Sequence, residues 1–85
     1  MKKVIVIDDD PDQTAIAVQV LKDPKRQIRA FTDPLRALAA VSSEDVDLLI
    51  VDLSMPWIGG ADFIQSARHR QPNLAIFLVS GYSRG

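Results

Sequence analysis

Cysteine is absent from the 85 residues of this sequence, and no apolar stretch is long. The absence of cysteine excludes disulfides, thiolate metal sites and cysteine nucleophiles, and it is compatible with a reducing cytoplasm. The apolar stretches are far shorter than the ~20 residues of a membrane span, and the run Val4–Ile7 is too short for the core of a signal peptide. The net charge of −1 does not indicate a nucleic acid or an anionic lipid as partner. We therefore expect one small cytoplasmic domain that binds neither nucleic acid nor membrane.

Apolar segments of strand length alternate with helical patterns along the chain. The expected strands are Val4–Ile7, Ile28–Phe31, Asp47–Val51 and Leu74–Val79. The helices expected between them are Pro11–Lys22, Leu35–Val41 and Ala61–Gln71. Strict alternation of strands and helices predicts an α/β fold with right-handed crossovers, a parallel sheet and helices on both of its faces.

Two Asp-Pro pairs predict where helices begin, because Asp caps a helix and Pro suits the first helical position. These pairs are Asp10-Pro11 and Asp33-Pro34. The apolar face of the second helix is expected to contain Leu35, Leu38 and Ala39. The apolar face of the third helix is expected to contain Phe63, Ile64 and Ala67. Residues 42–45 are expected to form a turn.

Polar side chains follow three of the expected strands. Asp8 and Asp9 follow the first strand, Asp52 follows the third and Ser80 follows the fourth. In a parallel α/β sheet, ligands bind at the carboxyl ends of the strands, so these residues should meet at one edge. Carboxylates that lie close together repel one another unless a cation, a helix N-terminus or solvent compensates. The pattern therefore indicates an acidic pocket.

Two alternatives for this pocket fit less well. A calcium loop would use Asp8, Asp10 and Asp12, but the positions where that loop needs glycine and glutamate hold Gln13 and Gln19. A phosphatase with a D-x-D-x-T motif would match residues 10–14. That match is weakened because two further aspartates separate the motif from the strand and no lysine follows Lys25.

Three motifs in the right order carry a resemblance to a known family. An acidic pair, Asp8-Asp9, ends the first strand; Asp52 ends the third and is followed by Met55-Pro56 and by a glycine pair, Gly59-Gly60; Ser80-Gly81 ends the fourth. Together they resemble the receiver domain of two-component response regulators, over essentially the whole chain. The resemblance implies a flavodoxin-like parallel sheet with strand order 2-1-3-4.

The resemblance also implies a function and a role for each motif. Asp52 would accept a phosphoryl group from a phosphohistidine on a sensor histidine kinase or a phosphotransfer protein. Asp8, Asp9, Asp52 and the backbone carbonyl of Ser54 would hold Mg²⁺ or Mn²⁺, which prefer such oxygen ligands. Ser80 would hydrogen-bond a phosphoryl oxygen and act as a switch. A receiver signals through protein–protein interaction and is not an enzyme beyond slow self-catalysed phosphorylation and dephosphorylation.

The sequence departs from the family pattern after the fourth strand. A complete receiver has a fifth strand that ends in a lysine, whereas this sequence has counterparts only for a (βα)₃β unit. We expect residues 1–85 to form a single truncated receiver-like domain, with Arg84 as the candidate substitute for the lysine. The alternative is a pseudo-receiver that serves as a dimerisation or scaffold module without phosphorylation.

Two apolar segments predict a homodimer. The fourth strand, Leu74–Val79, would be a long apolar edge, and such edges pair with other chains. The first helix carries apolar residues over a wide part of its surface between Ile16 and Leu21, more than packing against one sheet requires. We expect both segments to contact a second copy.

Overall fold

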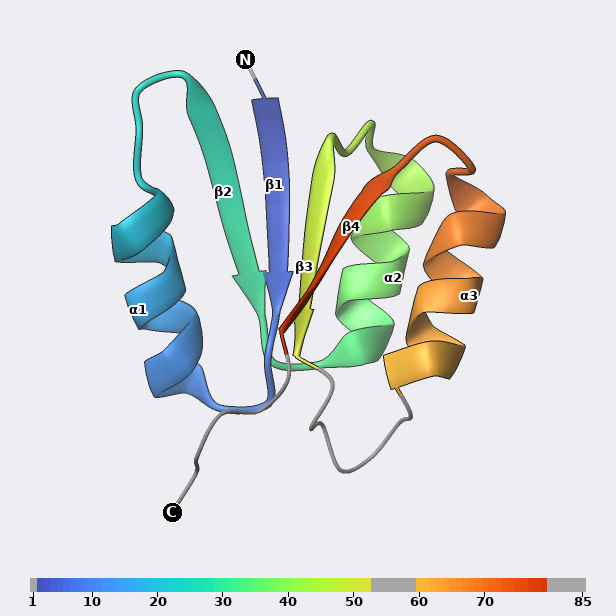
Figure 1. The fold of residues 1–85 in the computed structure, drawn as a ribbon, viewed down its shortest axis with the longest axis horizontal. Helices are drawn as coiled ribbons and strands as arrows, with labels where there is room; N and C mark the ends of the chain where they lie inside the picture. The colour runs from blue at the N-terminus through green and yellow to red at the C-terminus, as the bar shows by residue number, and fades with distance from the viewer. Residues whose placement is uncertain (1, 53–59, 80–85) are drawn as a thin grey trace.

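The computed structural model describes residues 2–52 and 60–79 of the chain. Its strands are β1 (Lys2–Ile7), β2 (Arg26–Phe31), β3 (Leu48–Asp52) and β4 (Ala75–Val79). Its helices are α1 (Pro11–Leu21), α2 (Pro34–Ser43) and α3 (Gly60–Arg70), as Figure 1 shows. Every expected element is present in its expected order, with bounds that differ by at most two residues.

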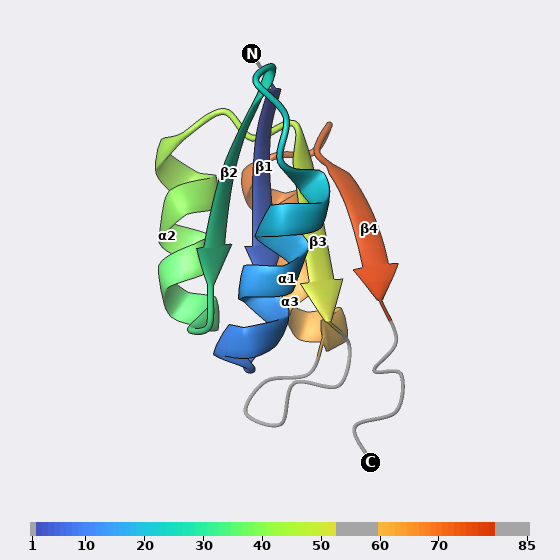
Figure 2. The same ribbon diagram turned by 90° about the vertical axis from the view of Figure 1, so that its left-hand side faces the viewer.

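All neighbouring strands of the sheet are parallel, and their order is β2-β1-β3-β4. The predicted strand order is therefore confirmed. Helix α1 lies on one face of the sheet, while α2 and α3 lie side by side on the other (Figures 1 and 2). Because Ile7 at the end of β1 is paired with Val51 of β3, the residues that follow these two strands reach the same edge of the sheet.

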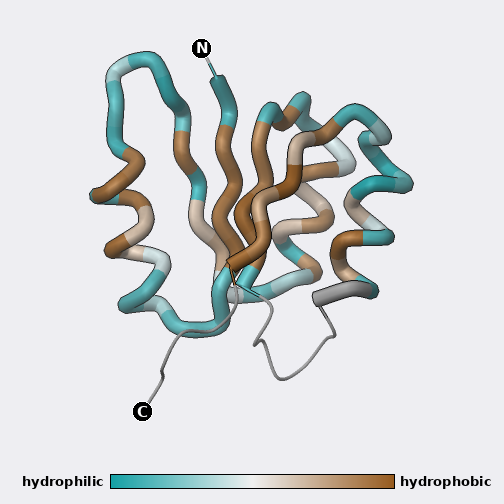
Figure 3. The backbone as a smooth tube through the Cα atoms, in the orientation of Figure 1, coloured by the Kyte–Doolittle hydropathy of each residue, from teal (hydrophilic) through white to brown (hydrophobic). Residues whose placement is uncertain are grey.

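The main core lies between the sheet and the pair α2 and α3. The strands contribute Ile5, Ile7, Leu49 and Val51, and all four are buried. Helix α3 contributes Phe63 and Ala67, both fully buried, with Ile64 packed at the margin. The expected apolar face of α3 is thus confirmed. Figure 3 shows the apolar colour concentrated in the central strands, as expected for strands that are buried on both faces.

The expected apolar face of α2 is only partly right, because Leu38 packs against the core whereas Leu35 and Ala39 are exposed. Leu35 is 71% exposed, and the buried residues of this helix are Ala37, Ala40 and Val41. Small side chains allow a helix to approach its neighbours closely, and α2 packs against both α3 and the sheet. The larger Leu35 side chain therefore lies on the side of the helix that faces away from the core.

Side-chain hydrogen bonds mark the starts of α1 and α2 and the end of α2. The carboxylates of Asp10 and Asp33 accept hydrogen bonds from the backbone N–H groups of Asp12 and Leu35, each at 2.9 Å, which confirms the two predicted N-caps. Two of the residues expected in a turn instead complete α2, because their hydroxyl groups donate to carbonyl oxygens one turn earlier. These residues are Ser42 and Ser43.

The side chain of Gln71, just after α3, holds the end of α2 in place. Its amide nitrogen donates to the carbonyl oxygens of Val41 and of Glu44, the latter at 2.6 Å. Its amide oxygen accepts from the backbone N–H of Val46 at 3.2 Å. One side chain thereby satisfies three backbone groups at the turn between α2 and β3.

Replacing Gln71 by Ala should lower the free energy of unfolding by about 1–3 kcal/mol, because partly buried backbone groups would lose their partners. Urea denaturation followed by far-UV circular dichroism measures the change. Gln65→Ala is the matched control, since Gln65 is an exposed glutamine on α3. Equal stability of the two variants would show that Gln71 does not hold this turn.

No helix in the described part of the chain is long and apolar enough to cross a membrane.

Candidate metal centre

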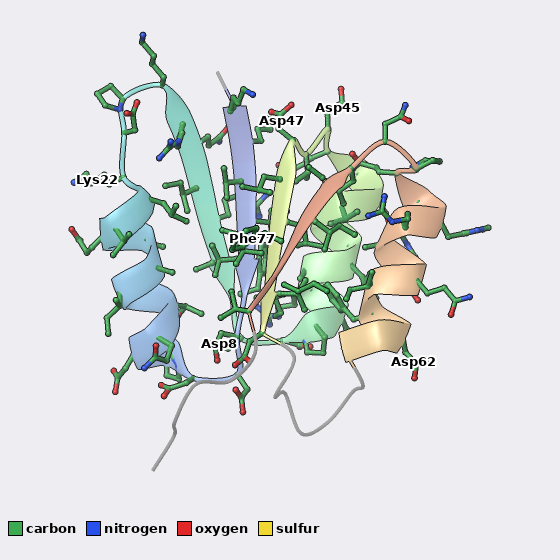
Figure 4. All side chains as sticks on the ribbon, in the orientation of Figure 1. Asp8, Lys22, Asp45, Asp47, Asp62 and Phe77 are labelled. Atoms are coloured by element: carbon green, nitrogen blue, oxygen red, sulfur yellow. The ribbon has the colours of Figure 1, made fainter. Side chains whose placement is uncertain are left out.

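The carboxyl ends of β1 and β3 bring three carboxylates together. Asp8 and Asp9 directly follow β1, and Asp52 is the last residue of β3. One carboxylate oxygen from each residue lies within 4.8 Å of the other two. Figure 4 shows Asp8 at this edge of the sheet. The sequence-based expectation that these three residues meet is confirmed.

Hydrogen bonds on two sides fix the position of Asp8. Its backbone N–H donates to the carbonyl oxygen of Phe31 at 3.1 Å, which continues the pairing of β1 with β2 by one residue. Its carboxylate accepts from the backbone N–H of Asp10 at 3.0 Å. The first bond anchors the backbone to the sheet, and the second ties the side chain to the loop that leads into α1.

Burial distinguishes the three carboxylates. Asp52 is only 5% exposed, whereas Asp8 and Asp9 are half-buried. Asp10, the fourth acid of this region, is the N-cap of α1. The cluster therefore has one carboxylate at its floor and two at its opening.

The donor set fits a hard divalent cation. Magnesium is bound in proteins by one or two carboxylates together with other oxygen ligands, and it keeps several waters. Three carboxylate oxygens within 4.8 Å of one another can share one such ion, which would also offset their mutual repulsion. Other proposed site residues, Ser54, Ser80 and Arg84, lie outside the residues that the structure describes.

Comparison with known families decides where the chain belongs. The family model described as the response regulator receiver domain matches residues 4–84. The chain belongs to this family. As a receiver domain, it is a signalling component of two-component systems.

Individual relatives agree with this assignment. A response regulator receiver protein of Anaeromyxobacter sp. (strain Fw109-5) is 24% identical over 82 residues, which are 96% of this chain and 34% of that protein. The chain thus spans about a third of the length of this relative. A crystal structure of the response regulator TrrA from Thermotoga maritima in complex with Mg²⁺-BeF is 29% identical, with a TM-score of 0.86, and the match covers 98% of this chain and 72% of that one.

A second crystal structure places TrrA in complex with the histidine kinase ThkA. This TrrA chain is 28% identical to the receiver described here, with a TM-score of 0.85, and the match covers 99% of this chain and 72% of that one. The flavodoxin-like fold expected from the sequence is therefore confirmed both by the strand order and by its structural neighbours.

Two local features of this region were missed from the sequence. One is the hydrogen bond from the backbone of Asp10 to the side chain of Asp8, and the other is the placement of Asp52 inside β3 and not after it. A signal for the first was present, because aspartates in turns commonly accept from the backbone two residues later. The second depends on pairing with β4, where Asp52 is opposite Val79.

Proposed function

We propose that this receiver domain accepts a phosphoryl group on Asp52, with Mg²⁺ bound beside it, and signals through protein–protein interaction in the cytoplasm. The donor is a phosphohistidine on a sensor histidine kinase or a phosphotransfer protein. The observation that carries the proposal is the nearly complete burial of Asp52 within 4.8 Å of the carboxylates of Asp8 and Asp9. The complex of the similar protein TrrA with a histidine kinase supports the proposed donor.

The reaction assigns a role to each member of the cluster. A carboxylate oxygen of Asp52 forms a bond to phosphorus as the bond from phosphorus to the histidine nitrogen breaks. Asp8 and Asp9 would hold the metal ion together with Asp52 and the backbone carbonyl of Ser54; Mn²⁺ could replace Mg²⁺ on the same oxygens. When bound, the ion supplies positive charge to the oxygens of the phosphoryl group.

Two further roles rest on the sequence alone. Ser80 is proposed to donate a hydrogen bond to a phosphoryl oxygen and to report phosphorylation by changing position. Arg84 is proposed to supply the positive charge that the family's lysine provides. A guanidinium can bind two oxygens of a phosphoryl group at once, so it is chemically suited to this task.

Incubation with acetyl phosphate and Mg²⁺ should add about 80 Da to the intact mass, because a small acyl phosphate can replace the protein donor. Chelation of Mg²⁺ by EDTA should prevent the addition. Amide NMR signals of Asp9 and Asp52 should shift when Mg²⁺ is added without phosphate, which tests metal binding separately. A receiver that binds no Mg²⁺ and gains no mass would contradict the proposal and favour the non-phosphorylated scaffold.

We further propose that the domain forms a homodimer through α1 and β4. Phe77 is 62% exposed and is paired with Ile50 of β3. Because Leu49 and Val51 belong to the core beneath α2 and α3, Ile50 and Phe77 lie on the opposite face of the sheet, where α1 packs. On α1, Ile16 and Val20 are also exposed and lie one turn apart. In an isologous dimer, these surfaces would cover one another.

Light scattering at tens of micromolar should therefore give twice the chain mass of 9.4 kDa. Phe77→Asp should give a mass near that of one chain, because a buried charge at the contact costs several kcal/mol. The matched control is Leu35→Asp, which alters an apolar side chain on α2 that is even more exposed than Phe77. A folded wild-type protein with the mass of one chain would rule out the dimer.

A further inference from the structure

A cavity lies at the opposite end of the sheet from the acidic cluster. It has a volume of about 380 Å³ and is located where α1 ends and β2 begins. Its apolar walls are formed by Val18, Pro24 and Ile28. Its polar rim is formed by Gln19, Lys22, Asp23 and Arg26. Apolar walls with a few polar groups at the rim are typical of ligand-binding pockets.

Cations outnumber acids around the cavity itself, while Asp45 and Asp47 lie elsewhere at this end of the sheet, before β3. Lys2 and Lys25 lie beside the cavity's own cations, since the backbone N–H of Lys2 donates to the carbonyl oxygen of Lys25 and Lys2 is paired with Arg26. The ion pairs among the described residues join Lys3 and Arg29 to Glu44, so neither Lys22 nor Arg26 has a carboxylate partner there. Figure 4 shows the Lys22 side chain pointing away from the body of the protein.

The single acid of the cavity is already used within the turn. The carboxylate of Asp23 accepts a hydrogen bond from the backbone N–H of Lys25 at 2.8 Å. Asp23 also anchors the start of β2, because its carbonyl oxygen accepts from the backbone N–H of Arg26 at 3.0 Å. These bonds account for Asp23 as a turn residue, and the rim keeps a surplus of positive charge because Lys22 and Arg26 face this single acid.

Arg26 is held in a position that suits binding of a carboxylate. One nitrogen of its guanidinium donates to the carbonyl oxygen of Leu21, the last residue of α1, at 2.9 Å. That bond compensates the negative end of the helix, so Lys22 is not needed for this purpose. The remaining N–H groups of the guanidinium form a fork whose geometry matches a carboxylate.

We propose that this cavity docks an acidic segment of a partner protein. In that segment, one apolar side chain is flanked by two carboxylates. The apolar side chain would enter the space between Val18, Pro24 and Ile28, while Lys22 and Arg26 bind the carboxylates. The site lies about 20 Å from the acidic cluster, the length of the six residues of β1. That distance exceeds the Debye length of about 8 Å at physiological salt, so the charge of a phosphoryl group on Asp52 should have little direct electrostatic effect on docking here.

The test is an NMR titration of the full chain with the peptide acetyl-Glu-Leu-Glu-amide. Saturable shifts of the amide signals are expected within residues 18–28, with little change at Asp8, Asp9 and Asp52. Acetyl-Gln-Leu-Gln-amide removes the charge, and acetyl-Glu-Gly-Glu-amide removes the apolar side chain. Each should bind at least about tenfold more weakly, because each lacks one of the two contacts.

A pair of double variants locates the site. Lys22→Glu with Arg26→Glu should weaken binding of the peptide at least about tenfold. Arg36→Glu with Arg70→Glu changes the net charge equally at exposed positions of α2 and α3 and should leave binding within about twofold. An equal loss of peptide affinity in both double variants would overturn the proposal. It would indicate that the peptide is attracted only by the net charge of the protein and not by this cavity.

Three other outcomes would also overturn it. Equal binding of the glycine peptide would show that the apolar walls are not used. Equal binding of inorganic phosphate would identify a simple anion site instead of a peptide site. Shifts that grow with protein concentration without peptide at residues 22–28, which lie outside the proposed dimer surface, and also at Asp8, Asp9 and Asp52 would identify the occupant as the acidic end of a second copy.

Discussion

Replacing Asp52 by Asn should abolish the mass increase produced by acetyl phosphate and Mg²⁺, a loss of at least ~100-fold in the rate of phosphorylation. The amide of asparagine has nearly the same shape as the carboxylate, but it is not a nucleophile. The buried position of Asp52 at the end of β3 should therefore keep its geometry while the reaction is lost. Intact-mass spectrometry over time measures the rate, and circular dichroism verifies the fold.

Asp62→Asn is the matched control, because Asp62 is an exposed carboxylate in the first turn of α3. It should be phosphorylated at the wild-type rate. A mass increase that persists in Asp52→Asn would show that another side chain is the acceptor. Loss in both variants would point to a general effect of removing negative charge, and would contradict the role assigned to Asp52.

The order of the elements could be predicted because its signals are local. Apolar strands, Asp-Pro pairs and polar turns each act within a few residues, and the N-caps at Asp10 and Asp33 are where the sequence indicated. The strand ends could not be predicted as well. Arg26 and Gln27 carry no strong strand signal, and they extend β2 because they pair with Lys2 and Lys3 of β1.

Which face of a helix is buried depends on what it packs against. Periodicity places Leu35 and Leu38 of α2 on one side, and their size favoured that side as the buried one. The structure packs Leu38 at the margin of the core but leaves Leu35 exposed, and the buried positions are mostly small residues where α2 packs against α3 and the sheet. Periodicity was sufficient for α3, where the large Phe63 side chain fills the core.

The acidic cluster was predictable because topology alone brings it together. Once β1 and β3 are adjacent and parallel, Asp9 and Asp52 must follow them at the same edge. The interactions of Gln71 with the turn after α2 had no comparable signal. A glutamine near a helix end is usually exposed, and its partners become apparent only when α2 and α3 are placed side by side.

Replacing Phe63 by Ala should lower the free energy of unfolding by about 3–5 kcal/mol, which combines the lost transfer free energy with the cost of a cavity. Phe63 is fully buried and lies in the core cluster with Leu49 and Val51 of β3. A domain of this size has a total stability of about 4–13 kcal/mol. The variant is therefore expected to be largely unfolded at 37 °C if the wild-type value lies at the lower end of that range.

Urea denaturation of three variants separates the stability that Phe63 contributes by packing in the core from the general effects of substitution. Phe63→Leu keeps most of the volume and should cost less than about 1.5 kcal/mol. Leu35→Ala removes an apolar side chain that is 71% exposed, and it should change the stability by no more than about 0.5 kcal/mol. If Phe63→Ala costs no more than Phe63→Leu, the space around Phe63 collapses without penalty, and the core between α3 and the sheet is not the main source of stability in this domain.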